Sequence, residues 1–295
     1  MKVTKRMLCV MSMLILFVGL TFTQKESDFT SPTIGTLKYV PAGSFQRDEG
    51  NDNISTVSVF YISEKEITRE QFEKVMGYDP SDTYNSTGQQ DPVQQVNWYH
   101  ALVFCNKLSM LEGLTPLYTI NGSTNPVRWG SVPTTNNPLW DAVRADWSAD
   151  GYRLPTEIEW MWAAMGADSE NPGKVNTTGY TKLFAGSNGN NSIGNYSCYN
   201  ENSSYKTHPV GTKQPNELGL YDMSGNVWEW CWDWWAKEYP ASSITNYKGA
   251  TSGGLRVFRG SSWESSASEA GVAYRNYGGP FIQCYDLGFR VVRSN

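Results

Sequence analysis

The sequence predicts one compact domain that mixes short strands with helices and is rich in loops. Helix starts are marked at Thr68, where Gln71 completes a capping-box spacing, and at Thr156, which acidic residues follow in the first turn. Short apolar and aromatic runs punctuated by glycine are typical of buried strands. The long stretch 166–216 is rich in Gly, Asn and Ser, which predicts loop.

Composition limits the function classes. Hydrophobic residues make up 39% of the chain, but aromatic residues make up 14% and include 12 tryptophans, so large rings can build one sizeable core. The net charge is −5 and no block of Lys or Arg is long enough to bind nucleic acid, which we therefore do not expect as a partner. With only two histidines, zinc sites and histidine-based catalysis are poorly supplied. We expect a monomer.

The N-terminus has the layout of a signal peptide. Three basic residues precede an apolar run over 7–22, which is short for a membrane-spanning helix and is followed by polar residues. We expect 1–23 to be a signal peptide, 24–34 a linker and 35–295 a single domain. The chain is then exported, either secreted or at the cell surface. The alternative is an uncleaved N-terminal anchor, the only membrane contact that the sequence suggests.

Four cysteines follow the predicted signal peptide. Their spacing is wide and irregular and does not resemble a disulfide framework, and the three complete pairings that four cysteines allow all stay open. They are Cys105, Cys198, Cys231 and Cys284.

The first part of the domain is predicted to alternate strands and helices. Residues 37–45 predict a strand with a turn, and residues 57–63 a second strand. The capping box opens a helix over 68–76. A second helix is predicted over 99–111, with Cys105 on its core face because Ala, Leu and Cys recur there at helical spacing.

Regular elements become fewer after residue 112. Residues 118–120 predict a short strand, and Thr156 caps a helix that continues to 165. In 228–234 every second residue is tryptophan, a period of two that predicts a strand with one aromatic face.

The C-terminal segment, 256–293, has two patterned ends and an unpatterned middle. Residues 259–263 and 287–292 predict buried strands. Residues 264–286 mix Ser, Gly, Tyr, Phe, Ile and Gln with no helical or strand period. A segment held at both ends and unpatterned between them predicts a surface patch on a rigid scaffold, where binding residues tend to lie.

Seven motifs in order along the chain together resemble the formylglycine-generating enzyme (sulfatase-modifying factor) family. The resemblance covers nearly all of the mature chain. It implies an α+β, loop-rich variant of the C-type-lectin-like fold. The motifs are 40–43 (VPAG), 66–68 (EIT), 96–98 (VNW), 151–160 (GYRLPTEIEW), 219–230 (GLYDMSGNVWEW), 259–263 (RGSSW) and 288–290 (GFR).

The catalytic activity of that family does not follow from the fold. The enzymes oxidise a substrate cysteine with a pair of active-site cysteines, and the resemblance places that pair at Ser265 and Ala270. Because neither is cysteine, we expect no enzymatic activity and no catalytic cofactor.

The absence of cysteine at these two positions points to a second resemblance, to the variable proteins of diversity-generating retroelements. These proteins share the fold, and their C-terminal segment is rewritten at selected codons. The resemblance puts framework residues at Trp263, Ala267, Arg275, Pro280 and 287–290. It implies an unknown macromolecular ligand, with a protein as the expected class. The expected ligand-binding positions are Glu264, Ser265, Ser266, Ser268, Glu269, Tyr274, Asn276, Tyr277, Gly278, Gly279, Phe281, Ile282, Gln283, Cys284, Tyr285 and Asp286.

The residue types at these positions agree with a binding surface. Tyrosine gives large contact area at low entropic cost, whereas Ser, Gly and Asn adapt their hydrogen bonds. The expected anchors are Tyr274, Tyr277, Phe281 and Tyr285. Glu264, Glu269 and Gln283 do not arise from adenine changes in an asparagine codon, so they imply other template codons. The alternative is an ordinary loop whose aromatic residues belong to the core.

The motif at 219–230 also matches the calcium loop of the family. The resemblance implies ligands at Asp222, Gly225 (carbonyl), Val227 (carbonyl) and Glu229, and a structural role for the ion. The alternative is that the two carboxylates only cap or hydrogen-bond the loop.

Two other functions remain open. One is an oxidase of the wider family that uses different chemistry, which would need a metal held by histidine and carboxylate. The other is an interaction module of the cell envelope with fixed specificity, which predicts no template repeat in the genome.

Overall fold

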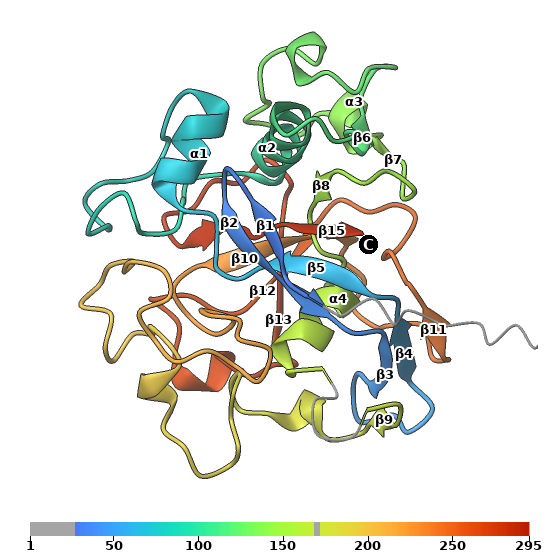
Figure 1. The fold of residues 1–295 in the computed structure, drawn as a ribbon, viewed down its shortest axis with the longest axis vertical. Coiled ribbons are helices and arrows are strands. Elements are labelled where there is room, and N and C mark those ends of the chain that lie inside the picture. The colour runs from blue at the N-terminus through green and yellow to red at the C-terminus, as the bar shows by residue number, and fades with distance from the viewer. Residues whose placement is uncertain (1–26, 168–171, 295) are drawn as a thin grey trace, which may run out of the picture.

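The computed structural model describes residues 27–167 and 172–294. Figure 1 shows strands crossing the middle of this part of the chain, with α1 (Arg69–Met76) and α2 (Trp98–Leu111) at the top and long loops at the lower left. The predicted signal peptide, 1–23, lies outside the described residues. Within the described ranges, no helix is long and apolar enough to cross a membrane.

A five-stranded antiparallel sheet joins the start of the described chain to its end. Its order is β1-β2-β5-β15-β8, so the last strand lies between two others and pairs with both. This fixes the C-terminal end of the segment that precedes it. The strands are β1 (Phe29–Ser31), β2 (Gly35–Val40), β5 (Phe60–Ser63), β15 (Val292–Ser294) and β8 (Tyr152–Arg153).

A four-stranded sheet holds the C-terminal segment. Its order is β13-β12-β10-β14, and β10 pairs antiparallel with β12 and parallel with β14. The two ends of the segment therefore flank one tryptophan-rich strand. The strands are β13 (Arg275–Gly278), β12 (Arg256–Arg259), β10 (Trp228–Trp234) and β14 (Leu287–Gly288).

The remaining elements are short. A second four-stranded sheet has the order β11-β4-β3-β9, and β6 pairs with β7. These strands are β11 (Ile244–Thr245), β4 (Ile54–Val57), β3 (Gly43–Gln46), β9 (Val175–Asn176), β6 (Tyr118–Thr119) and β7 (Arg144–Ala145). The short helices are α3 (Pro138–Asp141), η1 (Pro126–Arg128), η2 (Gly179–Thr181), η3 (Ile193–Asn195) and η4 (Ala267–Glu269).

Both predicted helix starts are confirmed as reciprocal caps. Thr68 Oγ1 accepts from Gln71 N at 3.1 Å, and Gln71 Oε1 accepts from Thr68 N at 3.0 Å. Thr156 and Glu159 make the same exchange at the start of α4 (Glu157–Ala164). Cys105 is buried in the core face of α2, as predicted.

Aromatic rings build much of the core. The predicted strand at 228–234 is confirmed as β10, and its residues Trp228 and Trp230 are buried in the core. The Arg256 guanidinium lies 3.6 Å from the Trp98 ring centroid and 3.2 Å from that of Trp234. The Trp98 and Trp230 indoles each donate to a backbone carbonyl, so their N–H groups are satisfied inside the protein.

Four predictions of local structure are corrected. The buried strand expected over 259–263 lies earlier, as β12, because Gly260 and Ser261 have left-handed backbone. The predicted linker over 24–34 includes β1, which pairs with β2; as an edge strand it has partners on one side only, so its polar residues are compatible with solvent. The single strand expected over 57–63 is two strands, β4 and β5, which lie in different sheets. The middle of the C-terminal segment contains β13, which pairs with β12 although its sequence lacks an apolar alternation.

Candidate ligand-binding surface

The predicted ligand-binding positions differ widely in exposure. Glu264, Ser268, Tyr274, Tyr277, Gln283 and Tyr285 are exposed. Ser266, Glu269, Asn276, Phe281, Ile282, Cys284 and Asp286 are half-buried. Ser265, Gly278 and Gly279 are buried.

The three buried positions correct the prediction that all sixteen face a ligand. Ser265 Oγ accepts from the backbone N–H of Ser262 at 3.2 Å, so its hydroxyl stabilises the turn after β12. A Cβ at Gly278 would lie 2.3 Å from Ile282 Cδ1, so the backbone there is packed against its own segment. Gly279 is likewise closed off by the Phe281 ring. These residues shape the segment but cannot present side chains to a partner.

Two exposed tyrosines are fixed against buried tryptophans. Tyr285 is 39% exposed, and its ring centroid lies 5.6 Å from that of Trp263. Tyr274 is 38% exposed and lies 6.0 Å from Trp228. Each ring therefore has one side supported by the core and part of its surface open.

Carboxylates also hold these two tyrosines. The Tyr285 hydroxyl donates to Glu264 at 3.1 Å, and the Tyr274 hydroxyl donates to Glu269 at 3.1 Å. The hydrogen bond to Glu264 raises the pKa of Tyr285 above its ordinary value. The two hydrogen bonds also fix the orientation of both phenol rings.

Tyr277 lies on the face of the sheet opposite to that of Tyr274. It lies on β13, where successive side chains point to opposite faces, so it shares a face with Arg275 and not with Asn276. Its ring lies 4.4 Å from that of Trp235, and the Arg275 guanidinium packs on the same tryptophan. The predicted anchors are thus divided between two faces.

Phe281 is the fourth predicted anchor, and it is half-buried. Together with Ile282 and Cys284 it packs against the main core cluster. This matches the alternative interpretation for that aromatic residue, as part of the core.

Two loops that are remote from the C-terminal segment in sequence lie beside it. The Asn200 N–H donates to the Ser265 carbonyl at 3.1 Å, and the Gln95 N–H donates to the Cys284 carbonyl at 2.9 Å. The loops 79–95 and 197–207 thus border the C-terminal segment. No local pattern in the sequence signals this, because every contact joins residues far apart in the chain.

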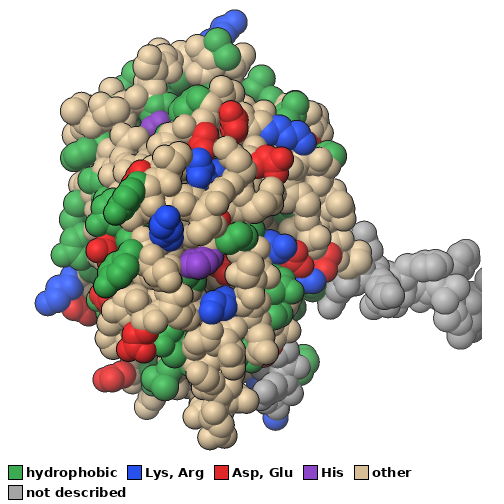
Figure 2. Space-filling model, turned by 90° about the vertical axis from the view of Figure 1, so that its left-hand side faces the viewer, with side chains coloured by type: hydrophobic (Ala, Val, Ile, Leu, Met, Phe, Trp, Pro, Cys, Tyr) green, Lys and Arg blue, Asp and Glu red, His purple; other side chains and the backbone are tan. Residues whose placement is uncertain are grey.

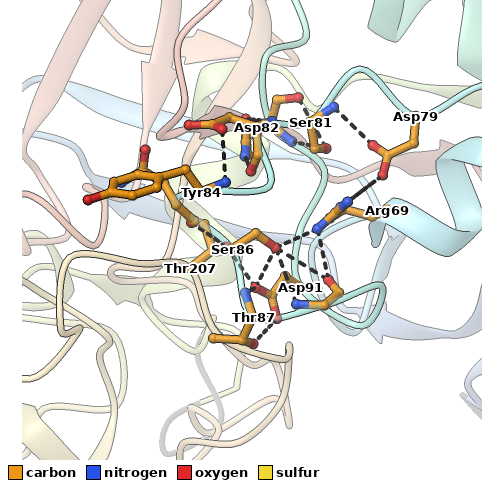
Figure 3. Close-up of polar contacts among 12 residues, drawn as sticks. Arg69, Asp79, Ser81, Asp82, Tyr84, Ser86, Thr87, Asp91 and Thr207 are labelled. Carbon is orange, nitrogen blue, oxygen red and sulfur yellow. Dashed lines mark hydrogen bonds and ion pairs between the residues drawn. The ribbon is translucent and has the colours of Figure 1, made fainter.

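Asp91 organises both loops (Figure 3). Its buried carboxylate accepts from the hydroxyls of Ser86 at 2.8 Å, Thr87 at 2.7 Å and Thr207 at 2.8 Å. Ser86 also accepts from Arg69, which is ion-paired with Asp79 in the same loop. A carboxylate with so many donors rigidifies the backbone around it.

The two positions at which the resemblance implies catalytic cysteines, Ser265 and Ala270, carry no thiol. Ser265 is buried and bonded as described, and Ala270 is buried with its carbonyl accepting from Ser224. Burial raises the pKa of Cys284, the cysteine of this segment, which keeps it a thiol. Burial also lowers the pKa of His100 to about 4, and its Nδ1 lies 2.6 Å from Asn97 Oδ1.

The predicted calcium loop is tightly bonded at one of its two carboxylates. Both oxygens of Glu229 accept from Arg290 at 2.7 Å, and Oε2 also accepts from the Trp160 indole. Glu229 therefore does not fit a metal ligand. Among the described residues, no group of three or more His, Cys, Asp or Glu side chains is arranged to hold a metal ion.

Asp222 fits a cation better. Its Oδ2 accepts from the Gly211 N–H at 2.7 Å, and burial raises its pKa to about 6. Nearby Glu66 is also buried, and burial and the charge of Asp222 raise its pKa. Ser197 Oγ is buried beside Gly225 without a hydrogen-bond partner. Burial thus disfavours the ionised forms of both carboxyls, and among the described residues the Ser197 hydroxyl has no hydrogen-bond partner.

Comparison with known proteins identifies the family. The model described as "Sulfatase-modifying factor enzyme 1-like domain" matches residues 23–295. The chain belongs to this family. The predicted family resemblance and the loop-rich α+β fold are confirmed.

Within the sulfatase-modifying factor family, the relatives divide by how much of each chain is shared. "Treponema denticola variable protein 1" has a similar structure, with a TM-score of 0.78, 38% identity and coverage of 91% of this chain and 99% of that one. "Chaperone protein LppX" of Paenibacillus barcinonensis is 35% identical over 88% of this chain and 89% of its own length. The formylglycine-generating enzyme of Streptomyces coelicolor is 37% identical, but over 52% of each chain. Neither the variable protein nor the LppX chaperone, each similar over most of its length, is named as an enzyme.

Proposed function

We propose that this chain is an exported, non-enzymatic binding protein of the variable-protein type. Its C-terminal segment binds a macromolecular ligand, and the ligand is itself a protein. The observation that carries the proposal is the pair of exposed tyrosines, Tyr274 and Tyr285, each fixed against a buried tryptophan. The similarity to a variable protein over nearly the whole chain supports it.

The physical reason is preorganisation. A tyrosine held by a neighbouring ring and a hydroxyl hydrogen bond loses little conformational entropy when a ligand covers it. The backbone around the segment is fixed by β12, β14 and β15, so its exposed residues can change without moving the scaffold. This combination suits a surface whose specificity depends on a few side chains.

Sequencing the gene and its neighbourhood tests the diversification part of the proposal. We expect a near-copy of the codons for residues 256–293 that differs mainly at adenines, with a reverse-transcriptase gene close by. A neighbourhood with neither would refute diversification and favour an envelope module of fixed specificity.

The second candidate is an oxidase of the formylglycine-generating type. The identity of 37% to such an enzyme over half of the chain favours it. Incubating the purified chain with a cysteine-containing sulfatase peptide and measuring the peptide mass separates the two. We expect no mass change; conversion of the cysteine to an aldehyde would establish the enzyme.

We also propose a structural calcium ion at the loop 222–227. Asp222 would hold it together with the carbonyls of Gly225 and Val227. The ion would stabilise the ionised forms of Asp222 and Glu66, which burial disfavours, because Arg290 is already paired with Glu229.

A further inference from the structure

Two tyrosines outside the C-terminal segment are more exposed than those within it. Tyr84 is 80% exposed and Tyr205 is 78% exposed. Asn85 connects their loops: its side chain donates to the Tyr205 carbonyl at 3.1 Å, and its carbonyl accepts from the Thr207 N–H at 3.0 Å. The two tyrosines thus belong to neighbouring loops that are joined by these two hydrogen bonds.

Both tyrosines are displayed from rigid backbone. The Asp91 network fixes the loop that carries Tyr84, and Figure 3 shows the Tyr84 ring pointing away from that network. Ser204 and Tyr205 adopt left-handed backbone with φ of 54° and 60°. This conformation is strained for a non-glycine residue, and such strain tends to cluster at functional sites. The fold thus holds Tyr205 outward at an energetic cost.

The same loops are hydrogen-bonded to the C-terminal segment. Besides the Asn200–Ser265 and Gln95–Cys284 backbone contacts, the Gln283 side chain donates to the Gln95 carbonyl at 2.8 Å. One ligand that covers Tyr285 can therefore reach the adjoining loops.

The charge of this region indicates the chemistry of the partner. Among the exposed and half-buried residues of the two loops and of 264–286, five carboxylates but one cation, Lys206, have no ion pair with a described residue. Figure 2 shows one face of the molecule, with hydrophobic side chains gathered along its left edge and both acidic and basic side chains among them. The five carboxylates are Asp82, Glu201, Glu264, Glu269 and Asp286.

We infer that Tyr84 and Tyr205 extend the C-terminal surface and that the extended surface binds a stretch of protein rich in lysine and arginine. Cationic side chains are attracted both to tyrosine ring faces and to the free carboxylate oxygens beside them. The inference rests on the proposed function, because it names the partner of the same surface. It adds contact residues that lie outside the segment expected to vary.

Selection from a display library of random linear peptides on the purified chain tests the inference. We expect the selected peptides to be enriched in lysine and arginine. Their affinities are then measured for Tyr84→Ala/Tyr205→Ala and for Tyr274→Ala/Tyr285→Ala, each checked for an unchanged melting temperature. Removing two anchoring tyrosines should weaken binding about tenfold or more in each variant.

Matched controls separate specific from general effects. Val127→Ala/Leu183→Ala removes exposed apolar side chains elsewhere and should leave binding unchanged. Glu201→Gln/Glu264→Gln should weaken binding about tenfold, because a hydrogen bond to a charged group is lost at each position. Glu49→Gln removes one negative charge at an exposed position outside the proposed binding surface and should leave the affinity nearly unchanged.

The outcomes distinguish this inference from the proposed function. Unchanged binding by Tyr84→Ala/Tyr205→Ala, with weakened binding by Tyr274→Ala/Tyr285→Ala, would overturn the extension and leave the proposed function standing. Unchanged binding by both variants, or no selected peptide, would overturn both. Selected peptides without lysine and arginine, or a glutamine variant that binds as its control does, would overturn the basic partner.

Discussion

Replacing Arg290 by methionine tests what holds the C-terminal segment to the scaffold. Arg290 is buried and donates two hydrogen bonds to the equally buried Glu229, both at 2.7 Å. It also donates to the carbonyls of Ser63 at 3.1 Å and Tyr221 at 2.9 Å. One side chain thereby connects β10, the end of β5 and the loop before the tryptophan strand.

The expected loss of stability in Arg290→Met follows from the Glu229 carboxylate, which is left buried without its partner. Removing one partner of a buried ion pair costs about 3–5 kcal/mol, because the other charge stays buried without compensation. The two carbonyls add to this, so we expect Arg290→Met to lower the free energy of unfolding by at least about 4 kcal/mol. At roughly 2–4 °C per kcal/mol, this lowers the melting temperature on the order of 10 °C.

Urea denaturation followed by tryptophan fluorescence measures the effect. The double variant Arg290→Met/Glu229→Gln should recover a large part of the loss, because glutamine keeps an acceptor for Trp160 but carries no charge. Lys38→Met, which breaks the partly exposed ion pair with Asp28, is the control and should cost about 1 kcal/mol or less. A loss below about 1 kcal/mol for Arg290→Met, or no recovery in the double variant, would refute the reasoning.

Three further predictions concern single residues. Tyr277→Ala should leave binding of the selected peptides within about twofold in Kd, since Tyr277 lies on the opposite sheet face against Trp235; a loss matching that of Tyr285→Ala in a peptide titration would contradict the two-face assignment. The pKa of Asp222 is raised from 3.8 to about 6, so its contribution to the free energy of unfolding is present below about pH 4 and is lost as pH rises through 6. In Asp222→Asn the urea midpoint should therefore depend less on pH over that range. The same pH dependence in the variant and in wild type would contradict this. Added calcium at pH 8 should raise the melting temperature by about 2 °C or more, an increase that Asp222→Asn should abolish; no effect of calcium or of a chelator on wild type would argue against the ion.

Local signals in the sequence predicted the elements that depend on near neighbours. The cap at Thr68 needs only the residue three positions later, and the strand at 228–234 needs only its own alternation. The family motifs then supplied the overall fold, which no local pattern specifies. Prediction therefore worked best where the stabilising partners are close in the chain or belong to a recognised motif.

Contacts between distant residues explain what the sequence could not supply. The hydrogen bond from Thr207 to Asp91 joins residues 116 positions apart, so the two loops beside the C-terminal segment had no sequence signal. The division of Tyr274 and Tyr277 between two faces depends on β13, which forms because β12 offers an edge to pair with. In the segment itself, pairing with a neighbouring strand overrides the lack of periodicity.

The boundary between fixed and changeable positions in the segment follows from packing. A Cβ at Gly288 would lie 2.4 Å from the Val93 carbonyl oxygen, and Phe289 is buried with its ring 5.2 Å from that of Phe104. Almost any substitution there would cost stability through a clash or a cavity. The side chain of Tyr285, three residues earlier, is exposed and is held through its hydroxyl and one ring face. Substitutions at such a position change what the surface can bind while leaving the buried motif at 288–290 intact, which is the physical condition that a diversified binding surface requires.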